Sequence, residues 1–353
     1  MSRIEEIDKN FKVDVTINKE DIRYHSIFDE PFKIYGLFYE DGKFRRLPEA
    51  VAKTVNDGVL GLHANTAGGR VRFKTDSDYV AIKASISNST RMDHFTLVGS
   101  AGFDIYVNEN GFENYNGTFR PPYTLKDGYE SVINFKNKEM REITIHFPLY
   151  SDVNKLYIGL CKNALIEEPS RYTYEKPVVF YGSSITQGGC ASRPGNAYQN
   201  ILSRRLRFDH VNLGFSGSAR AEDTIIDYIN GLEMSVFVYD YDHNAPDVTH
   251  LRNTHEKMFL RIREKHPNLP ILMMTRPKFY LNDEEKERFE IVKKTYENAI
   301  NRGDKNVYFI PGPKLMEKAL NEGTVDDCHP TDLGFYSMAD AIEPVLKEIL
   351  ENI

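Results

Sequence analysis

The chain has 353 residues, 41% of them hydrophobic, and a net charge of −7. This length exceeds one ordinary hydrophobic core and predicts two domains. The acidic balance disfavours a nucleic-acid-binding surface, no apolar run approaches the roughly 20 residues of a membrane span, and three cysteines are too few for a disulfide scaffold. Because Met1–Phe11 is charged and lacks the apolar centre of a signal peptide, we expect a soluble, cytoplasmic protein.

Hydrophobic and polar residues alternate through much of the first half of the chain, from about Val13 to Ile166. Alternation of this kind is typical of strands that bury one face. Turn-forming Gly, Pro, Asn and Asp residues separate the strands, the clearest of which are 71–74, 80–86, 103–107, 143–147 and 156–160. The pattern predicts an N-terminal β-sandwich domain, similar to a jelly roll, over residues 1–168.

The pattern changes after a short hinge at Glu167–Ser170, and residues 169–353 form the second predicted domain. Short apolar runs predict buried strands at 178–181, 211–213, 236–239, 271–274 and 307–310. Helical windows lie between and after them, at 197–206, 224–229, 249–265, 283–301 and 334–351. Strands and helices that alternate in this way predict an α/β domain with a parallel sheet covered on both faces. Right-handed crossovers would place the loops after the strands along one edge.

Those loops carry residues suited to acyl transfer. Ser184 follows the first strand, and a serine hydroxyl becomes a good nucleophile only when a base takes its proton. His329 is the candidate base, and Asp326, three residues earlier, could fix its tautomer. The N–H groups of Ser184 and Gly217, with the side-chain amide of Asn244, would form an oxyanion hole.

At these residues the chain resembles the SGNH (GDSL-type) hydrolases. Tyr-Gly-Ser-Ser-Ile-Thr-Gln-Gly at 181–188 resembles the first block of the family, and Asn-Leu-Gly-Phe-Ser-Gly at 212–217 resembles the second. Asn244 matches the third block, and Asp-x-x-His-Pro at 326–330 matches the fifth. The resemblance implies a flavodoxin-like three-layer α/β/α domain and ester hydrolysis, with Ser184, Asp326 and His329 as the catalytic triad.

Upstream, Gly-Phe-Asp-Ile-Tyr at 102–106 is similar to the Gly-x-Asp-Leu-Tyr signature of a β domain that precedes this hydrolase in some bacterial esterases. Two positions depart from the family pattern. Ser183 stands where the family often has Asp, so the hydrogen bonding around the nucleophile must differ. The third block reads Asp-His-Asn-Ala at 242–245 in place of the common Gly-x-Asn-Asp.

We therefore expect a serine esterase that removes a small acyl group, most simply acetyl, from a carbohydrate or similar polar ester. A long apolar lid such as a lipase needs is not evident in the sequence. One alternative is an acyltransferase that uses the same triad, with an alcohol in place of water. Another is a carbohydrate-binding protein whose hydrolase domain is inert.

No cofactor is expected, and neither is a nucleic-acid or membrane partner. The spacing of His243, His250 and His255 does not place them on one helix face, so no metal site is expected there. Cys190 and Cys328 both fall in active-site loops, and whether their thiols meet stays open. The sequence also leaves open whether the protein is a homo-oligomer.

Overall fold

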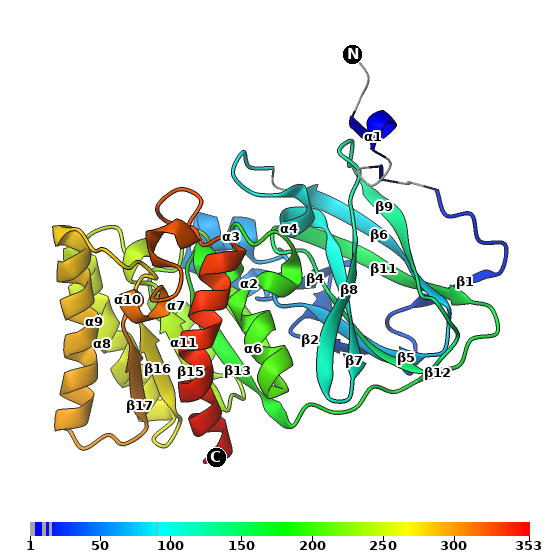
Figure 1. Cartoon of the computed structure of the whole chain (residues 1–353). Helices are drawn as coiled ribbons and strands as arrows, with labels where there is room; N and C mark the ends of the chain where they lie inside the picture. Colours follow the sequence, from blue (N-terminus) through cyan, green and yellow to red (C-terminus); the bar gives the residue numbers. More distant parts are fainter. Residues whose placement is uncertain (1–3, 9–11, 14–15, 90) are drawn as a thin grey trace.

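The computed structural model of the protein describes residues 4–8, 12–13, 16–89 and 91–353. Part of the segment Met1–Phe11 therefore lies outside the described residues, and Ile4–Ile7 forms the short helix α1. Figure 1 shows a β-rich N-terminal part beside a C-terminal part in which helices flank a sheet. Among the described residues, no helix is long and apolar enough to span a membrane.

The N-terminal domain is a sandwich of two sheets in which every strand pairing is antiparallel. One sheet has the order β1 (Ile22–Ser26), β11 (Ser151–Cys161), β6 (Tyr79–Ser89) and β9 (Gly128–Asn134). The other has the order β12 (Ile166–Glu167), β5 (Arg70–Thr75), β10 (Arg141–His146), β7 (Phe103–Glu109) and β8 (Phe112–Phe119), with β2 (Lys33–Tyr35) also paired to β5. A separate hairpin joins β3 (Phe38–Glu40) to β4 (Lys43–Arg45). The alternating residues fill the space between the sheets with one hydrophobic core, which confirms the predicted β domain.

Three helices of the N-terminal region were not predicted: α2 (Glu49–Val55), α3 (Asp57–Leu62) and α4 (Leu97–Ala101). The expectation of strands throughout this region was wrong for them. Asn56 caps α3 by accepting a hydrogen bond from the Val59 N–H at 2.9 Å. Leu47, Ala52 and Val59 are buried in the core of the C-terminal domain rather than in the sandwich. Helices α2 and α3 therefore belong spatially to the second domain.

The C-terminal domain is built on a five-stranded parallel sheet. Its order is β14 (Phe208–Gly214), β13 (Tyr174–Gly182), β15 (Val236–Asp240), β16 (Ile271–Met274) and β17 (Val307–Ile310). Numbered along the chain, this is the order 2-1-3-4-5 of flavodoxin-like folds. All five predicted strands are present, and the predicted fold class is confirmed.

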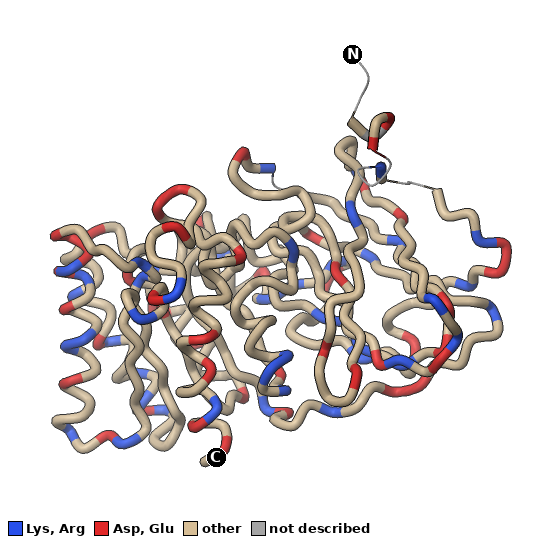
Figure 2. Tube along the Cα trace, in the orientation of Figure 1, with Lys and Arg blue, Asp and Glu red and all other residues tan. Residues whose placement is uncertain are grey.

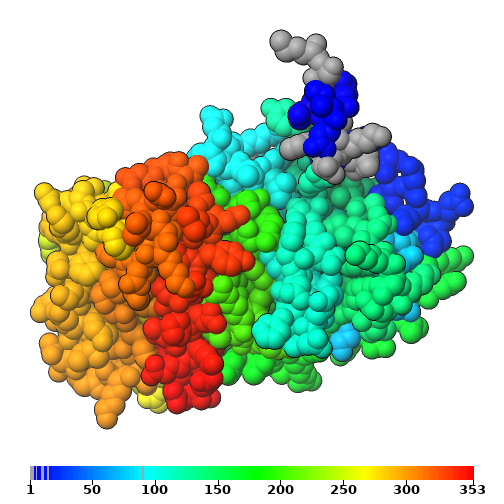
Figure 3. Space-filling view, in the orientation of Figure 1, coloured from blue at the N-terminus to red at the C-terminus, as the bar shows by residue number. Residues whose placement is uncertain are grey.

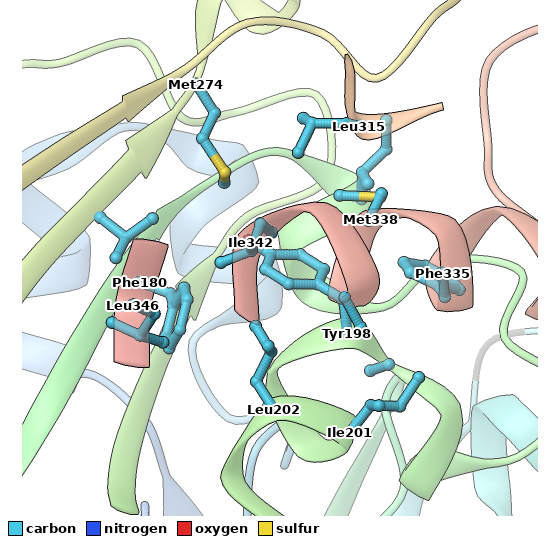
Figure 4. Packing of buried hydrophobic residues seen from close by; sticks show 14 of the residues in the cluster. Phe180, Tyr198, Ile201, Leu202, Met274, Leu315, Phe335, Met338, Ile342 and Leu346 are labelled. Atoms are coloured by element: carbon cyan, nitrogen blue, oxygen red, sulfur yellow. The ribbon is translucent and has the colours of Figure 1, made fainter. Parts of the chain in front are cut away.

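Both faces of the parallel sheet are covered because successive strand residues point to opposite sides. Val178 and Phe180 pack with α6 (Tyr198–Leu206) and α11 (Asp332–Glu351), as Figure 4 shows for part of this cluster. Val179 and Tyr181 pack on the other side with α7 (Asp223–Asn230), α8 (Val248–Lys265) and α9 (Asp283–Asn301). The result is the expected three-layer arrangement.

The two domains meet through an ion pair whose carboxylate is fully buried. Asp104 of β7 is fully buried and accepts hydrogen bonds of 2.9 Å from the Arg193 guanidinium and from the Gly195 N–H. Arg193 also donates to the Tyr106 hydroxyl. Asp104 and Tyr106 are the two polar side chains of the Gly-Phe-Asp-Ile-Tyr segment, and both bind Arg193 of the second domain. This segment therefore forms part of the contact between the domains. The surfaces of the two domains lie directly against each other in Figure 3.

The chain passes from one domain to the other between the end of β12 at Glu167 and the start of β13 at Tyr174. The boundary that we expected between residues 168 and 169 lies in this segment, and we retain it as a proposal. Figure 2 shows acidic and basic residues interspersed over both domains.

Candidate active site

The carboxyl edge of the parallel sheet brings the predicted site residues together. Strand order reverses around β13, which lies between β14 and β15. Open α/β sheets bind their ligands at such a reversal, beyond the carboxyl ends of the strands. Ser184 follows β13, Gly217 follows β14, and Asn244 follows β15.

Ser184 is the first residue of the short helix α5 (Ser184–Gln187) and is 5% exposed. Ser183 caps this helix by accepting a hydrogen bond from the Ile185 N–H at 3.1 Å. The N–H of Ser183 donates to the buried Asp240. Glycine is required at position 182, because a Cβ there would lie 1.8 Å from an Asp240 oxygen. Ser183, at the position where the resemblance would often have Asp, therefore caps α5. The carboxyl group near this turn is that of Asp240, which accepts the Ser183 N–H.

A continuous hydrogen-bond chain runs from Ser184 through His329 to Asp326. The Ser184 Oγ lies 2.9 Å from His329 Nε2, and His329 Nδ1 lies 2.7 Å from Asp326 Oδ2. The other carboxylate oxygen accepts from the backbone N–H groups of Cys328 and His329. Partial burial alone would raise the pKa of Asp326, but the hydrogen bonds from His329 outweigh it and hold this pKa below its ordinary value. An ionised Asp326 can keep the proton on Nδ1, which leaves Nε2 free to accept the serine proton.

The two other predicted donors are Gly217, in the loop after β14, and Asn244, which follows β15 and contacts that loop. Gly217 has a left-handed φ of 66°, and no atom lies within 4 Å of where its Cβ would be. Among the described residues, its N–H has no hydrogen-bond acceptor. The Asn244 amide donates to the Phe215 carbonyl at 3.0 Å, which leaves its second N–H available. The Phe215 N–H in turn donates to the Gly182 carbonyl at 2.8 Å, and this bond joins the loop to the Ser184 turn.

The sequence did not point to Arg46, which holds the same loop from the N-terminal domain. Its guanidinium is fully buried and donates to the carbonyl oxygens of Gly214 at 2.6 Å and Asn212 at 3.2 Å. It also donates to the carbonyls of Leu62 and Asn65. Burial lowers the pKa of Arg46 to about 10. No local motif marks this residue, because its partners lie elsewhere in the sequence.

Gln187 links the same parts of the molecule. Its amide donates to the Asn65 side chain at 3.1 Å and accepts from the Ser216 N–H at 3.1 Å. Asn65 donates to Asp152 of the sandwich at 2.7 Å. The N-terminal domain therefore supports both the Ser184 turn and the loop of Gly217.

Potential metal ligands also occur at this edge. His94 of the N-terminal domain, Cys190 and His329 form a close group among the described residues. His243, His250 and His255, in contrast, have separate partners: Asp242, the Arg220 carbonyl and Thr295. All three cysteines are free thiols.

Family comparisons agree with this architecture. Residues 175–347 match the model of the GDSL-like Lipase/Acylhydrolase family. Residues 22–166 match GxDLY, described as the N-terminus of Esterase_SGNH_hydro-type. The chain belongs to the SGNH (GDSL-type) hydrolases. It is accordingly a carboxylic ester hydrolase with a GxDLY-type N-terminal domain.

Solved structures resemble this SGNH hydrolase over both domains. A protein described as a GDSL-like lipase from Bacteroides ovatus has 28% sequence identity and a TM-score of 0.84, over 94% of this chain and 98% of that one. The salicylyl-acyltransferase SsfX3 from a tetracycline biosynthetic pathway has 19% identity and a TM-score of 0.74, also over 94% of this chain and 98% of that one. A family two carbohydrate esterase from Cellvibrio japonicus has 12% identity and a TM-score of 0.62, again over 94% and 98%. No curated protein matches the sequence.

Proposed function

We propose that this SGNH hydrolase removes a small acyl group, most simply acetyl, from a carbohydrate or similar polar alcohol. The hydrogen-bond chain from Ser184 through His329 to Asp326 is the observation that carries the proposal. It holds a nucleophile, a base and an orienting carboxylate in the order that acyl transfer requires.

In the proposed reaction, the Ser184 hydroxyl attacks the ester carbonyl while His329 Nε2 takes its proton. His329 then gives this proton to the departing alcohol, and an acyl-serine forms. A water molecule, deprotonated by His329, attacks the acyl-serine. His329 then returns this proton to the departing Ser184 oxygen, and the acid is released. Asp326 stabilises the imidazolium in both steps. The N–H groups of Ser184 and Gly217 and the Asn244 amide would bind the oxyanion.

The carbohydrate part of the proposal is supported by fold likeness and by the polar character of the site. The similar structure from Cellvibrio japonicus is described as a carbohydrate esterase and has the same two-domain extent. The free thiols are consistent with a cytoplasmic location, which we include in the proposal.

A second candidate is acyl transfer to an alcohol other than water. The observation in its favour is the likeness to a protein described as a salicylyl-acyltransferase. The same Ser184 chemistry serves both reactions, because they differ only in the nucleophile that attacks the acyl-serine. An inert hydrolase domain is less well supported, because Ser184, His329 and Asp326 are joined by hydrogen bonds.

The test is acetate release from a panel of acetylated sugars, beside p-nitrophenyl esters of increasing chain length. We expect turnover that falls as the acyl chain lengthens and that is lost in Ser184→Ala. Ser183→Ala is the matched control and should retain turnover, because Ser183 caps α5 without contacting the reacting atoms. Acylated product on an added sugar acceptor would favour the transferase. No turnover with any ester, and no labelling of Ser184 by a fluorophosphonate, would contradict both candidates.

A further inference from the structure

Three side chains that can ligate a metal converge beside Ser184. They are His94, in the loop that follows β6 of the N-terminal domain, Cys190, which follows α5, and His329. One ligand atom of each lies within 4.8 Å of the ligand atoms of the other two. His94 Nε2 is 3.7 Å from Asp326 Oδ2, and its ring centre is 5.6 Å from that of His329. The group thus combines residues from both domains.

The surrounding structure holds two members of this group firmly. Asp326 accepts the Nδ1 hydrogen bond of His329, which leaves Nε2 as the nitrogen that can ligate. The backbone at Gly189 lies against the His329 ring, since a Cβ at that glycine would be 3.5 Å from Cδ2. Cys190 follows directly, with a φ of 76° and only 9% of its surface exposed. The turn therefore keeps the thiol near the His329 ring.

Two imidazoles and one thiolate are a ligand set that Zn²⁺ prefers. Ligand atoms around a tetrahedral zinc ion lie about 3.3–3.7 Å apart, given zinc–ligand distances of about 2.0–2.3 Å. Closing the group to this geometry needs a movement of roughly 1 Å. His94 can supply it, because its side chain is 38% exposed in the turn between Met92 and Phe95.

We propose that His94, Cys190 and His329 form a zinc site that reversibly inhibits the enzyme. Asp326 would orient His329 for the metal as it does for catalysis, because carboxylates commonly fix the ligating histidines of zinc sites. On binding, the Cys190 thiol releases its proton to solvent and the sulfur binds the ion. The Nε2 lone pair then binds zinc and can no longer accept the Ser184 proton. The inhibition rests on the proposed role of His329, whereas the site itself does not.

Binding is tested first without turnover, with Co²⁺ as the probe. Wild-type protein should show the absorption of a cobalt–thiolate bond and of tetrahedral cobalt. Cys190→Ser should lose the thiolate absorption, and His94→Ala should weaken binding about tenfold or more. Cys161→Ser and His25→Ala are the matched controls and should bind like wild type, because they lie in β11 and β1 of the sandwich. Thermal unfolding checks that each variant is folded.

Inhibition is then measured with Zn²⁺ and p-nitrophenyl acetate, each variant being compared with its own metal-free activity. We expect inhibition that a chelator reverses, that Mg²⁺ does not reproduce, and that needs about tenfold or more zinc in His94→Ala and Cys190→Ser. Equal inhibition of all variants, or a thiolate absorption that Cys328→Ser removes and Cys190→Ser does not, would overturn the site. Cobalt binding without zinc inhibition of an active enzyme would overturn the inhibitory role. A protein without esterase activity would contradict the proposed function, while cobalt binding would still test the site.

Discussion

The Arg46 guanidinium donates a hydrogen bond of 2.6 Å to the carbonyl oxygen of Gly214, three residues before Gly217. This contact crosses from the N-terminal domain to the end of β14, which leads into the loop that we propose as part of the oxyanion hole. The N-terminal domain therefore helps to set the position of a proposed catalytic N–H group, although it carries none of the proposed triad.

Replacing Arg46 with Lys should reduce the turnover number by up to about 100-fold, with a smaller change in KM. Lysine keeps a charge but cannot reach four carbonyl oxygens at once, so the loop of Gly217 would shift. Steady-state kinetics on p-nitrophenyl acetate measure the effect. Arg23→Lys, on the exposed side of β1, is the matched control. A Lys variant with wild-type turnover would show that Arg46 contributes to folding alone.

Asn244→Ala should lower the turnover number roughly 100- to 1,000-fold, because one oxyanion donor is lost. The same substitution at Asn268, in the loop before β16 at the opposite end of the sheet, should have no effect. If Asn244→Ala changes only KM, its amide binds the substrate in the ground state and is not an oxyanion donor.

Asp326→Asn should reduce kcat/KM by roughly 10³- to 10⁴-fold, because an amide cannot hold the His329 tautomer or stabilise the imidazolium. In wild type, the pKa of Asp326 lies below its ordinary value, so this carboxylate stays ionised as the pH falls from neutrality. We therefore expect that a loss of activity between pH 7 and about pH 5 would not come from protonation of Asp326. A pH profile of kcat/KM that is flat from about pH 5 to about pH 9 would argue against a histidine base.

The buried Asp240 provides a pH test of stability. Burial raises its pKa well above the ordinary value, despite hydrogen bonds from Thr186 and the Ser183 N–H. The folded state then binds this proton more tightly than the unfolded state does. Its contribution to stability is fully present at low pH and declines as the pH rises above about 4, the unfolded value.

Asp240→Asn should remove this decline. The difference between its thermal unfolding midpoint and that of wild type should therefore increase as the pH is raised from about 5 to about 8. Asp242→Asn is the matched control, because the pKa of Asp242 is shifted in the opposite direction. Burial would raise the pKa of Asp242, but hydrogen bonds from His243 and the Arg276 N–H lower it. That variant should lose stability relative to wild type above about pH 4. A difference between Asp240→Asn and wild type that does not vary with pH would contradict the buried, protonated carboxyl group.

Asp104→Asn should destabilise the protein by about 3–5 kcal/mol, because the partly buried Arg193 would lose its charged partner. Urea unfolding measures the free energy. Limited proteolysis between β12 and β13 reports whether the domains separate. Asp76→Asn, on the sandwich but away from this interface, is the control. Wild-type stability in Asp104→Asn would show that the ion pair does not hold the domains together.

The C-terminal domain was largely predictable because its signals are local. Each buried strand is a short apolar run, and each helix has its own apolar face, so the predicted and observed ranges agree closely for β16 and α9. The motif residues Ser184, Asp326 and His329 could be chosen because loops at one sheet edge must meet. Their catalytic roles stay predictions until the experiments above are done.

What the sequence did not reveal depends on contacts between distant segments. Helices α2 and α3 are only seven and six residues long, too short for a clear helical period, and their apolar side chains match a surface on the other domain. Arg46 and His94 likewise have no local pattern, because the groups that they contact at Gly214 and Asp326 lie far along the chain. Contacts of this kind can be identified only when the three-dimensional structure is known.

The packing of α2 and α3 on the second domain also constrains synthesis on the ribosome. Helix α3 ends at Leu62, whereas α7, which α2 contacts, begins at Asp223, about 160 residues later. At about 5–20 residues per second, Leu47, Ala52 and Val59 would wait roughly 8–30 s for their partners to emerge. During that interval these apolar side chains would stay exposed beside the growing sandwich, open to chaperones and to neighbouring nascent chains.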